Sequence, residues 1–136
     1  MKKEALKRIF EFLEEKEEHN PPFLWKWKNE IPLTEKDLDI EGDLDLTYSN
    51  IESLPEGLEV SGDLNLTFCE NISSLPEGLI VRGNLYLSYS NITSLPKGLK
   101  VWGDIIINKT KLIHYYSNEE IREMIKPGFI KGEIYR

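Results

Sequence analysis

The sequence predicts an α+β repeat solenoid, in which short coils stack their strands into a parallel sheet and a helical cap closes each end. Three observations indicate this fold class: a repeat of about 20 residues in mid-chain, alternation of apolar and polar residues within each repeat, and helix-like apolar spacing near both ends. The 136 residues are expected to form one domain, with an N-terminal helical and aromatic cap over 1–35, the solenoid over 36–115, and a C-terminal cap and arm over 116–136.

The repeat is visible as three consecutive copies that begin at Leu44, Leu64 and Leu85. The second copy is one residue longer than the others, and Glu70 is the extra residue. A decaying fourth copy begins at Ile105. Chance does not produce this self-similarity, so each copy is interpreted as one structural unit that needs its neighbours to bury its leucines.

Alternation inside a repeat predicts a strand with one buried face. One parity is apolar and the other polar; the apolar set is Leu58, Val60, Gly62, Leu64 and Leu66. Gly62 falls on the buried parity, where a bend or a close backbone approach would require a residue without a side chain. Pro55 and Gly57, just before this run, indicate a loop that returns the chain to the next strand, so each repeat is expected to form one coil.

The pattern Leu-x-Leu-x-x-Ser-x-Ile-x-x-Leu-Pro-x-x-Leu over residues 36–115 resembles a leucine-rich repeat. Its length and its Leu-Pro pair are similar to the short bacterial subclass found in secreted effectors and in many phage and prophage proteins. That resemblance implies a curved solenoid that recognises proteins. In the family an inward turn position usually holds Asn or Cys; here it holds Ser49, Cys69, Ser90 and Thr110. Effector ligases of this class add a catalytic domain with a nucleophilic Cys, for which this chain has no room.

Both ends carry helix signals. Residues 2–18 predict a helix that presents Leu6, Ile9, Phe10 and Leu13 on one face. The aromatic run around Trp25 and Trp27 is expected to plug the solenoid end, although its lysines also allow stacking on nucleic-acid bases. A capping box, Ser117 with Glu120, predicts a short helix that ends before Pro127, and residues 129–135 are expected to form a strand or an extended arm.

Charge narrows the possible partners. The net charge is −7, and residues 31–104 alone carry −9. This acidity argues against direct binding of nucleic acid, because a phosphate backbone is held by Lys and Arg, but it permits docking onto a basic protein surface. No apolar run of membrane-spanning length and no signal peptide is present, and Cys69 is the single cysteine, so we expect a cytoplasmic protein with no membrane partner.

Residues that could carry chemistry are few. With two histidines and one cysteine, we expect no catalytic site, no metal and no cofactor, and Cys69 is interpreted as a structural residue of the turn. The polar column Asp43, Asp63, Asn84 and Asp104 allows a Ca²⁺ site, but the favoured interpretation is that each side chain accepts from backbone donors at the bend. The column Tyr48, Phe68 and Tyr89 is expected only to pack.

The outward strand face is the best candidate for binding a partner. Toward the C-terminus it gathers residue types that dominate binding hot spots: Ile80, Arg82, Tyr86, Lys100, Trp102 and Ile106. The alternative is that the C-terminal arm folds back over this patch and makes it part of the core.

These observations predict a non-catalytic protein–protein interaction module, an inhibitor or adaptor that acts as a monomer or homodimer through the exposed strand face. The alternative function is an acidic, phage-borne inhibitor of a nucleic-acid enzyme, of the anti-defence or anti-CRISPR-like kind. An enzyme or metal-dependent protein, and an ice-binding solenoid using a Thr/Ser column, are weaker hypotheses.

Overall fold

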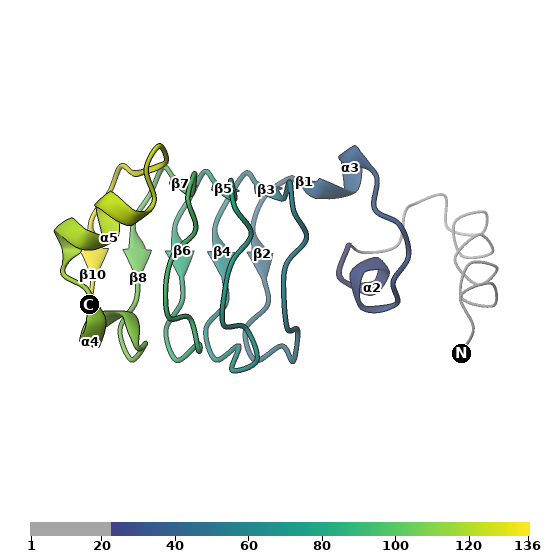
Figure 1. Cartoon of the computed structure of the whole chain (residues 1–136). Helices are drawn as coiled ribbons and strands as arrows, with labels where there is room; N and C mark the ends of the chain where they lie inside the picture. The colour runs from purple at the N-terminus through teal and green to yellow at the C-terminus, as the bar shows by residue number, and fades with distance from the viewer. Residues whose placement is uncertain (1–22) are drawn as a thin grey trace. The chain divides into compact units, whose positions relative to one another are not determined.

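The computed structural model describes residues 23–136 of the chain (Figure 1). The chain divides into two compact units, residues 1–38 and residues 39–136. This division falls close to the boundary expected at residue 35. The helix expected over 2–18 lies outside the described residues, and the single domain and the role of residues 1–35 as a lid stay predictions.

The described part of the first unit holds two short helices, α2 (Phe23–Lys28) and α3 (Glu35–Leu38). Lys26 is buried, and its Nζ lies 2.9 Å from the Asp37 carboxylate. Thr34 caps α3, because its side chain accepts from the Asp37 backbone while its own amide donates to that carboxylate. Burial raises the pKa of Asp37, but hydrogen bonds from Thr34 and Lys26 outweigh it and hold that pKa below its ordinary value.

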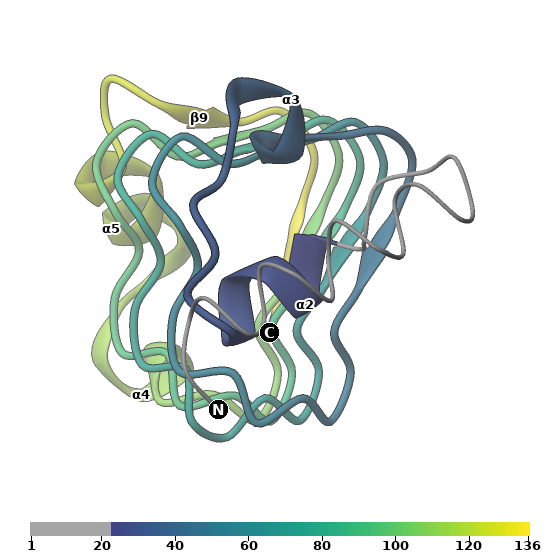
Figure 2. The ribbon, with the colours of Figure 1, turned by 90° about the vertical axis from the view of Figure 1, so that its right-hand side faces the viewer.

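The second unit is a parallel β-solenoid in which every coil contributes two short strands, one to each of two five-stranded sheets (Figure 2). Sheet A has the strand order β1-β3-β5-β7-β9 and sheet B the order β10-β8-β6-β4-β2. Sheet A consists of β1 (Asp39–Ile40), β3 (Glu59–Val60), β5 (Ile80–Val81), β7 (Lys100–Val101) and β9 (Phe129–Ile130). Sheet B consists of β2 (Leu44–Asp45), β4 (Leu64–Asn65), β6 (Leu85–Tyr86), β8 (Ile105–Ile106) and β10 (Ile134–Tyr135).

The coils repeat about 20 residues apart, as predicted. The strand pairing shows this, since Leu44 lies opposite Leu64 and Leu64 opposite Leu85. The expectation of one continuous sheet was wrong. The alternating run breaks into two strands at Gly62, where the chain turns a corner while its parity continues. A Cβ at Gly62 would lie 2.1 Å from Asp43 Oδ1 and 2.7 Å from the Gly42 carbonyl carbon, so the close approach inferred at this glycine is confirmed.

The polar column after each corner glycine is a ladder of hydrogen bonds that joins neighbouring coils. The backbone amides of Asp63 and Asn84 donate to the side-chain oxygens of Asp43 and Asp63, each at 2.7 Å. Asp104 N then donates to Asn84 Oδ1, and Glu133 N to Asp104 Oδ1, both at 2.8 Å. The interpretation of these side chains as backbone acceptors is therefore confirmed. Residues 23–136 contain no group of three His, Cys, Asp or Glu placed to hold a metal ion.

The core lies between the two sheets and the return loops, and Leu58, Leu66, Leu79 and Leu87 are among its fully buried side chains. The inward turn position holds small polar groups that satisfy carbonyls. Cys69 Sγ donates to Leu46 O at 2.9 Å, and the Ser90 and Thr110 hydroxyls donate to carbonyls at 2.7 and 2.6 Å. Burial raises the pKa of the Cys69 thiol, so this side chain stays protonated and packs as a small hydrophobe.

The C-terminal segment continues the stack after two short helices, α4 (Leu112–Tyr115) and α5 (Asn118–Met124). The capping box of Ser117 and Glu120 is present as predicted, and Ile121 and Ile125 are buried. Strands β9 and β10 then register beside β7 and β8, so residues 129–135 form strands. This segment extends both sheets sideways, and the alternative in which it folds back over the predicted patch is wrong.

Within residues 23–136, no helix is long and apolar enough to cross a bilayer.

Candidate functional site

The six residues predicted to bind a partner do not share one face, because the corner at each glycine separates them. Ile80 and Lys100 point outward from sheet A, and Arg82 and Trp102 follow them just before the corner. Tyr86 and Ile106 lie beyond the corner on sheet B. The prediction of one continuous patch was therefore wrong, and the residues form two surfaces.

The larger of these surfaces, which we name the sheet A face, consists of two outward columns. Strand register places one column along β1, β3, β5, β7 and β9, and backbone hydrogen bonds between neighbouring coils align the second column two residues later. The columns read Asp39, Glu59, Ile80, Lys100 and Phe129, and Glu41, Ser61, Arg82, Trp102 and Lys131. Val60, Val81 and Val101 alternate with them and are fully buried, so the listed side chains face outward.

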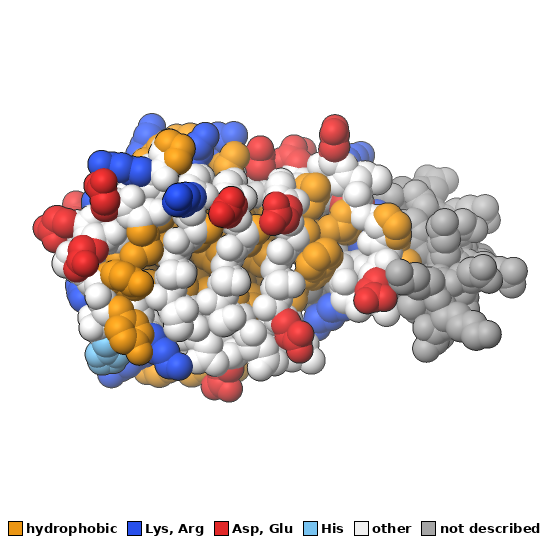
Figure 3. All heavy atoms as spheres, in the orientation of Figure 1, with side chains coloured by type: hydrophobic (Ala, Val, Ile, Leu, Met, Phe, Trp, Pro, Cys, Tyr) orange, Lys and Arg blue, Asp and Glu red, His pale blue; other side chains and the backbone are white. Residues whose placement is uncertain are grey.

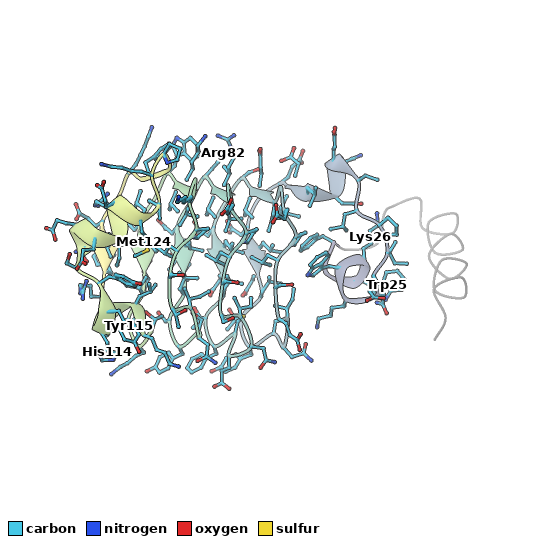
Figure 4. All side chains as sticks on the ribbon, in the orientation of Figure 1. Trp25, Lys26, Arg82, His114, Tyr115 and Met124 are labelled. Atoms are coloured by element: carbon cyan, nitrogen blue, oxygen red, sulfur yellow. The ribbon has the colours of Figure 1, made fainter. Side chains whose placement is uncertain are left out.

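Trp102 lies between two cations at the C-terminal end of this face, Lys131 and Arg82, the second of which is labelled in Figure 4. The Arg82 guanidinium carbon lies 5.0 Å from the centroid of the Trp102 ring, and Lys131 Nζ lies 5.6 Å from it. The Phe129 ring meets Trp102 edge to face, with centroids 4.9 Å apart. These distances fit cation–π and aromatic pairing, which holds the rings in place while Trp102 stays half-buried. We name Arg82, Lys100, Trp102, Phe129 and Lys131 the cation–aromatic cluster.

Charge is segregated along the solenoid. Residues 39–81 contain ten Asp or Glu and no Lys or Arg, whereas residues 82–136 contain nine Lys or Arg and five Asp or Glu. Figure 3 shows this along the upper edge, where basic side chains gather over the β7 end and acidic ones toward β3 and β1. The two regions meet at Arg82 and Glu59, whose charged atoms are 3.9 Å apart and whose side chains are about half exposed. Such a pair contributes little to stability.

The second surface lies on sheet B, whose outward column is Asp45, Asn65, Tyr86, Ile106 and Tyr135. Tyr86 OH accepts from Asn84 Nδ2 at 3.3 Å, which ties its ring to the corner. Hydrogen bonds from Thr47 lower the pKa of Asp45, so the N-terminal end of this column is firmly anionic. Its C-terminal end is apolar, and Tyr135 is 52% exposed.

The turn after sheet B carries the aromatic column as a ring stack. Ring centroids of Tyr48 and Phe68 lie 4.6 Å apart, and those of Phe68 and Tyr89 lie 4.3 Å apart, nearly parallel in both cases. All three residues have a positive backbone φ, near 60°, which residues other than glycine rarely adopt. The packing expected of this column is confirmed. A solvent-open hollow of about 650 Å³ lies beside it, bordered by Tyr89, Asn91, Lys109, Lys111 and His114.

Sequence reasoning missed Phe129, Lys131 and Tyr135. They belong to the same columns as Lys100, Trp102 and Ile106, but the paired positions of β7 and β9 are 29 residues apart in the sequence, with two helices between them. The Gly-Glu pair at 132–133 matches the Gly-Asp corner of earlier coils and was the available signal.

Comparisons with protein-family models, with curated proteins and with solved structures each give no match to this chain. The structure itself shows a parallel β-solenoid whose coils repeat about 20 residues apart.

Proposed function

We propose that this chain is a non-catalytic protein-binding module, an inhibitor or adaptor that acts by occupying a macromolecular partner in the cytoplasm. The observation that carries the proposal is the cation–aromatic cluster, in which Trp102 is partly exposed and contacts Arg82, Lys131 and Phe129. Trp and Arg dominate binding hot spots, and a ring already held in place loses little conformational entropy when a partner covers it.

The chemistry of the candidate nucleophile supports a non-catalytic role. Cys69 is the single cysteine of the chain, and it is fully buried with its thiol donating to a carbonyl. Nucleophilic catalysis by cysteine needs an exposed thiolate, and burial raises the pKa of this thiol. The resemblance to short bacterial and phage leucine-rich repeats, which recognise proteins, supports the same proposal.

A second candidate function is supported by the opposite end of the solenoid. The ten carboxylates of residues 39–81, with no Lys or Arg among them, present a surface suited to a basic, nucleic-acid-binding groove. On this proposal the chain is an acidic inhibitor of a nucleic-acid enzyme, of the phage-borne anti-defence kind. Its binding would then weaken steeply as salt rises, because the charges involved are solvent-exposed.

The experiment uses the full chain as bait in lysate of its own host, at low and at high salt, beside the variant Trp102→Ala. We expect a specific partner that Trp102→Ala loses while the variant keeps its unfolding midpoint. Tyr115→Ala is the matched control, because Tyr115 is an exposed aromatic residue of α4 (64%) that belongs to neither column of the sheet A face. A partner retained equally by all three baits would overturn the assignment to the sheet A face, and a nucleic-acid enzyme released by salt alone would favour the second candidate.

A further inference from the structure

The charge segregation of the sheet A face extends to the neighbouring return loop. The position between the loop proline and glycine holds Glu56 and Glu77 in the first coils and Lys97 in the next, and all three side chains are exposed. The sign of the charge therefore changes between Glu77 and Lys97 in the return loop, as it does between Glu59 and Arg82 on the sheet A face. Beyond Lys97 the return-loop side is occupied by α5, which carries acidic side chains of its own, so the charge segregation is clearest on the sheet A face.

Most charged side chains of this face form no ion pair with another residue of the described range, 23–136. Among residues 23–136, Arg82–Glu59 is the one ion pair on the sheet A face, and its closest atoms are 3.9 Å apart. Asp39, Glu41, Lys100 and Lys131 take part in no ion pair of the described chain. Unpaired charges of opposite sign at the two ends of one face make it complementary to a ligand with the reverse polarity.

The dimensions of the face limit what can cover it. Across the sheet, five strands at about 4.8 Å spacing give the face a length of about 19 Å. Along the strands the face is narrow, because each strand is two residues long. A helix of about 13 residues or an extended segment of about six residues spans that length. A second copy of the solenoid that contacted this strip alone would bury far less than the roughly 800 Å² per partner of a stable interface.

A nucleic-acid strand is excluded by the same charges. A phosphate backbone carries negative charge along its whole length, so beyond the cation–aromatic cluster it would meet Asp39, Glu41 and Glu59 within about 10–15 Å. A protein segment can change the sign of its charge within that distance.

We propose that the sheet A face binds one charge-segregated protein segment, with an acidic stretch on the cation–aromatic cluster and a basic stretch on Asp39, Glu41 and Glu59. The inference rests on the proposed function and names the chemistry of the partner. Trp102 and Phe129 cover the aliphatic stems of the acidic stretch, and Arg82, Lys100 and Lys131 hold its carboxylates.

The test compares two labelled peptides of about 12 residues, both half Glu and half Lys, the first with the charges in two blocks and the second with them alternating. Fluorescence anisotropy with the full chain at low salt should show the block peptide binding at least about tenfold more tightly than the alternating peptide. Lys100→Glu with Lys131→Glu should remove that difference. The control pair Lys109→Glu with Lys111→Glu, which makes the same charge change beside the turn hollow, should preserve it.

Equal binding of the two peptides, or equal losses in the two double variants, would overturn the inference. A thymidine oligonucleotide of similar length that binds more tightly than the block peptide would also overturn it, and so would a concentration-dependent dimer that the block peptide leaves intact in sedimentation. A host partner that depends on Trp102 while the block peptide shows no preference would leave the proposed function standing without this inference. If no host partner depends on Trp102 and the block peptide shows no preference, both the proposed function and this inference would be wrong.

Discussion

The coils of residues 39–81 and those of residues 82–136 share one interior and carry opposite exteriors. In both regions the inward positions hold fully buried leucines and valines, and each coil turns at a glycine that abuts the backbone of its neighbour. Outward, the first region presents carboxylates, and the second presents lysines, arginines and rings. Stacking of the coils therefore depends on the inward residues and the corner, which leaves the outward positions free to be selected for binding.

The corner ladder makes the same point at one position. Asp43, Asp63 and Asp104 accept a hydrogen bond from the next coil, and Asn84 does so with equal geometry and no charge. The solenoid therefore needs an oxygen acceptor at this position, and the charge there is available for other roles.

The largest expected effect tests the shared interior. Leu66 and Leu87 are fully buried at equivalent positions of the two regions, so Leu66→Ala and Leu87→Ala should each lower the free energy of unfolding by about 2–5 kcal/mol. Denaturant titration with Thr67→Ala as the outward control measures this. A small effect in only one region would break the comparison, because it would show that the two regions pack differently.

A smaller effect is expected at the corner, where two substitutions of Asp63 distinguish the need for an oxygen acceptor from the need for a negative charge. Asp63→Ala should cost about 1–3 kcal/mol, because it leaves the Asn84 amide without its partner, whereas Asp63→Asn should cost much less. The same titration compares the two variants. If Asn proves as damaging as Ala, the negative charge itself stabilises the stack and the inference from Asn84 is wrong.

Trp102→Ala should weaken binding of the captured partner by about 2 kcal/mol or more, which is roughly a 30-fold loss of affinity. The variant removes the ring that Arg82 and Phe129 hold in place in the cation–aromatic cluster. Titration calorimetry with the identified partner measures the loss, and Tyr115→Ala should leave affinity unchanged. A thermal midpoint that falls by many degrees in Trp102→Ala would instead show that this ring is a core element.

The smallest effect is expected at the border between the two regions. Glu59→Gln removes the partly exposed ion pair with Arg82, so the free energy of unfolding should change by less than about 0.5 kcal/mol. The same variant should make partner binding less sensitive to salt, since one exposed charge of the interface is gone. Unchanged salt dependence would place the acidic end of the face outside the interface.

Much of the solenoid could be predicted from the sequence, because the inward residues repeat in it. The coil length, the buried leucines, the close approach at Gly62 and the N-cap of α5 at Ser117 follow from spacing and composition. The corner between the sheets was missed, because the apolar–polar alternation runs through Gly62 without a change of parity. The expected patch was accordingly split, and only four of its residues share a surface.

A strand over residues 129–135 was one of two expectations, but its pairing with β7 and β8 was not predicted, for a different reason. Register across α4 and α5 depends on how many residues those helices take up, and the sequence contains no Leu-x-Leu signal over 129–135. Phe129 and Lys131, which complete the cation–aromatic cluster, therefore became visible only with the paired strands. Position along a repeat can be read from sequence, whereas position across an irregular insertion cannot.

We propose that the two regions bind one partner together, so reversing the charge of either region should prevent its capture. Three baits are compared by quantitative mass spectrometry of host proteins retained at low salt: the unchanged chain, Glu41→Lys with Glu59→Lys, and Arg82→Glu with Lys100→Glu. We expect the same partner to be lost from both charge-reversed baits while both remain folded. A partner that either reversed bait retains at the level of the unchanged chain would show that one region binds it without the other.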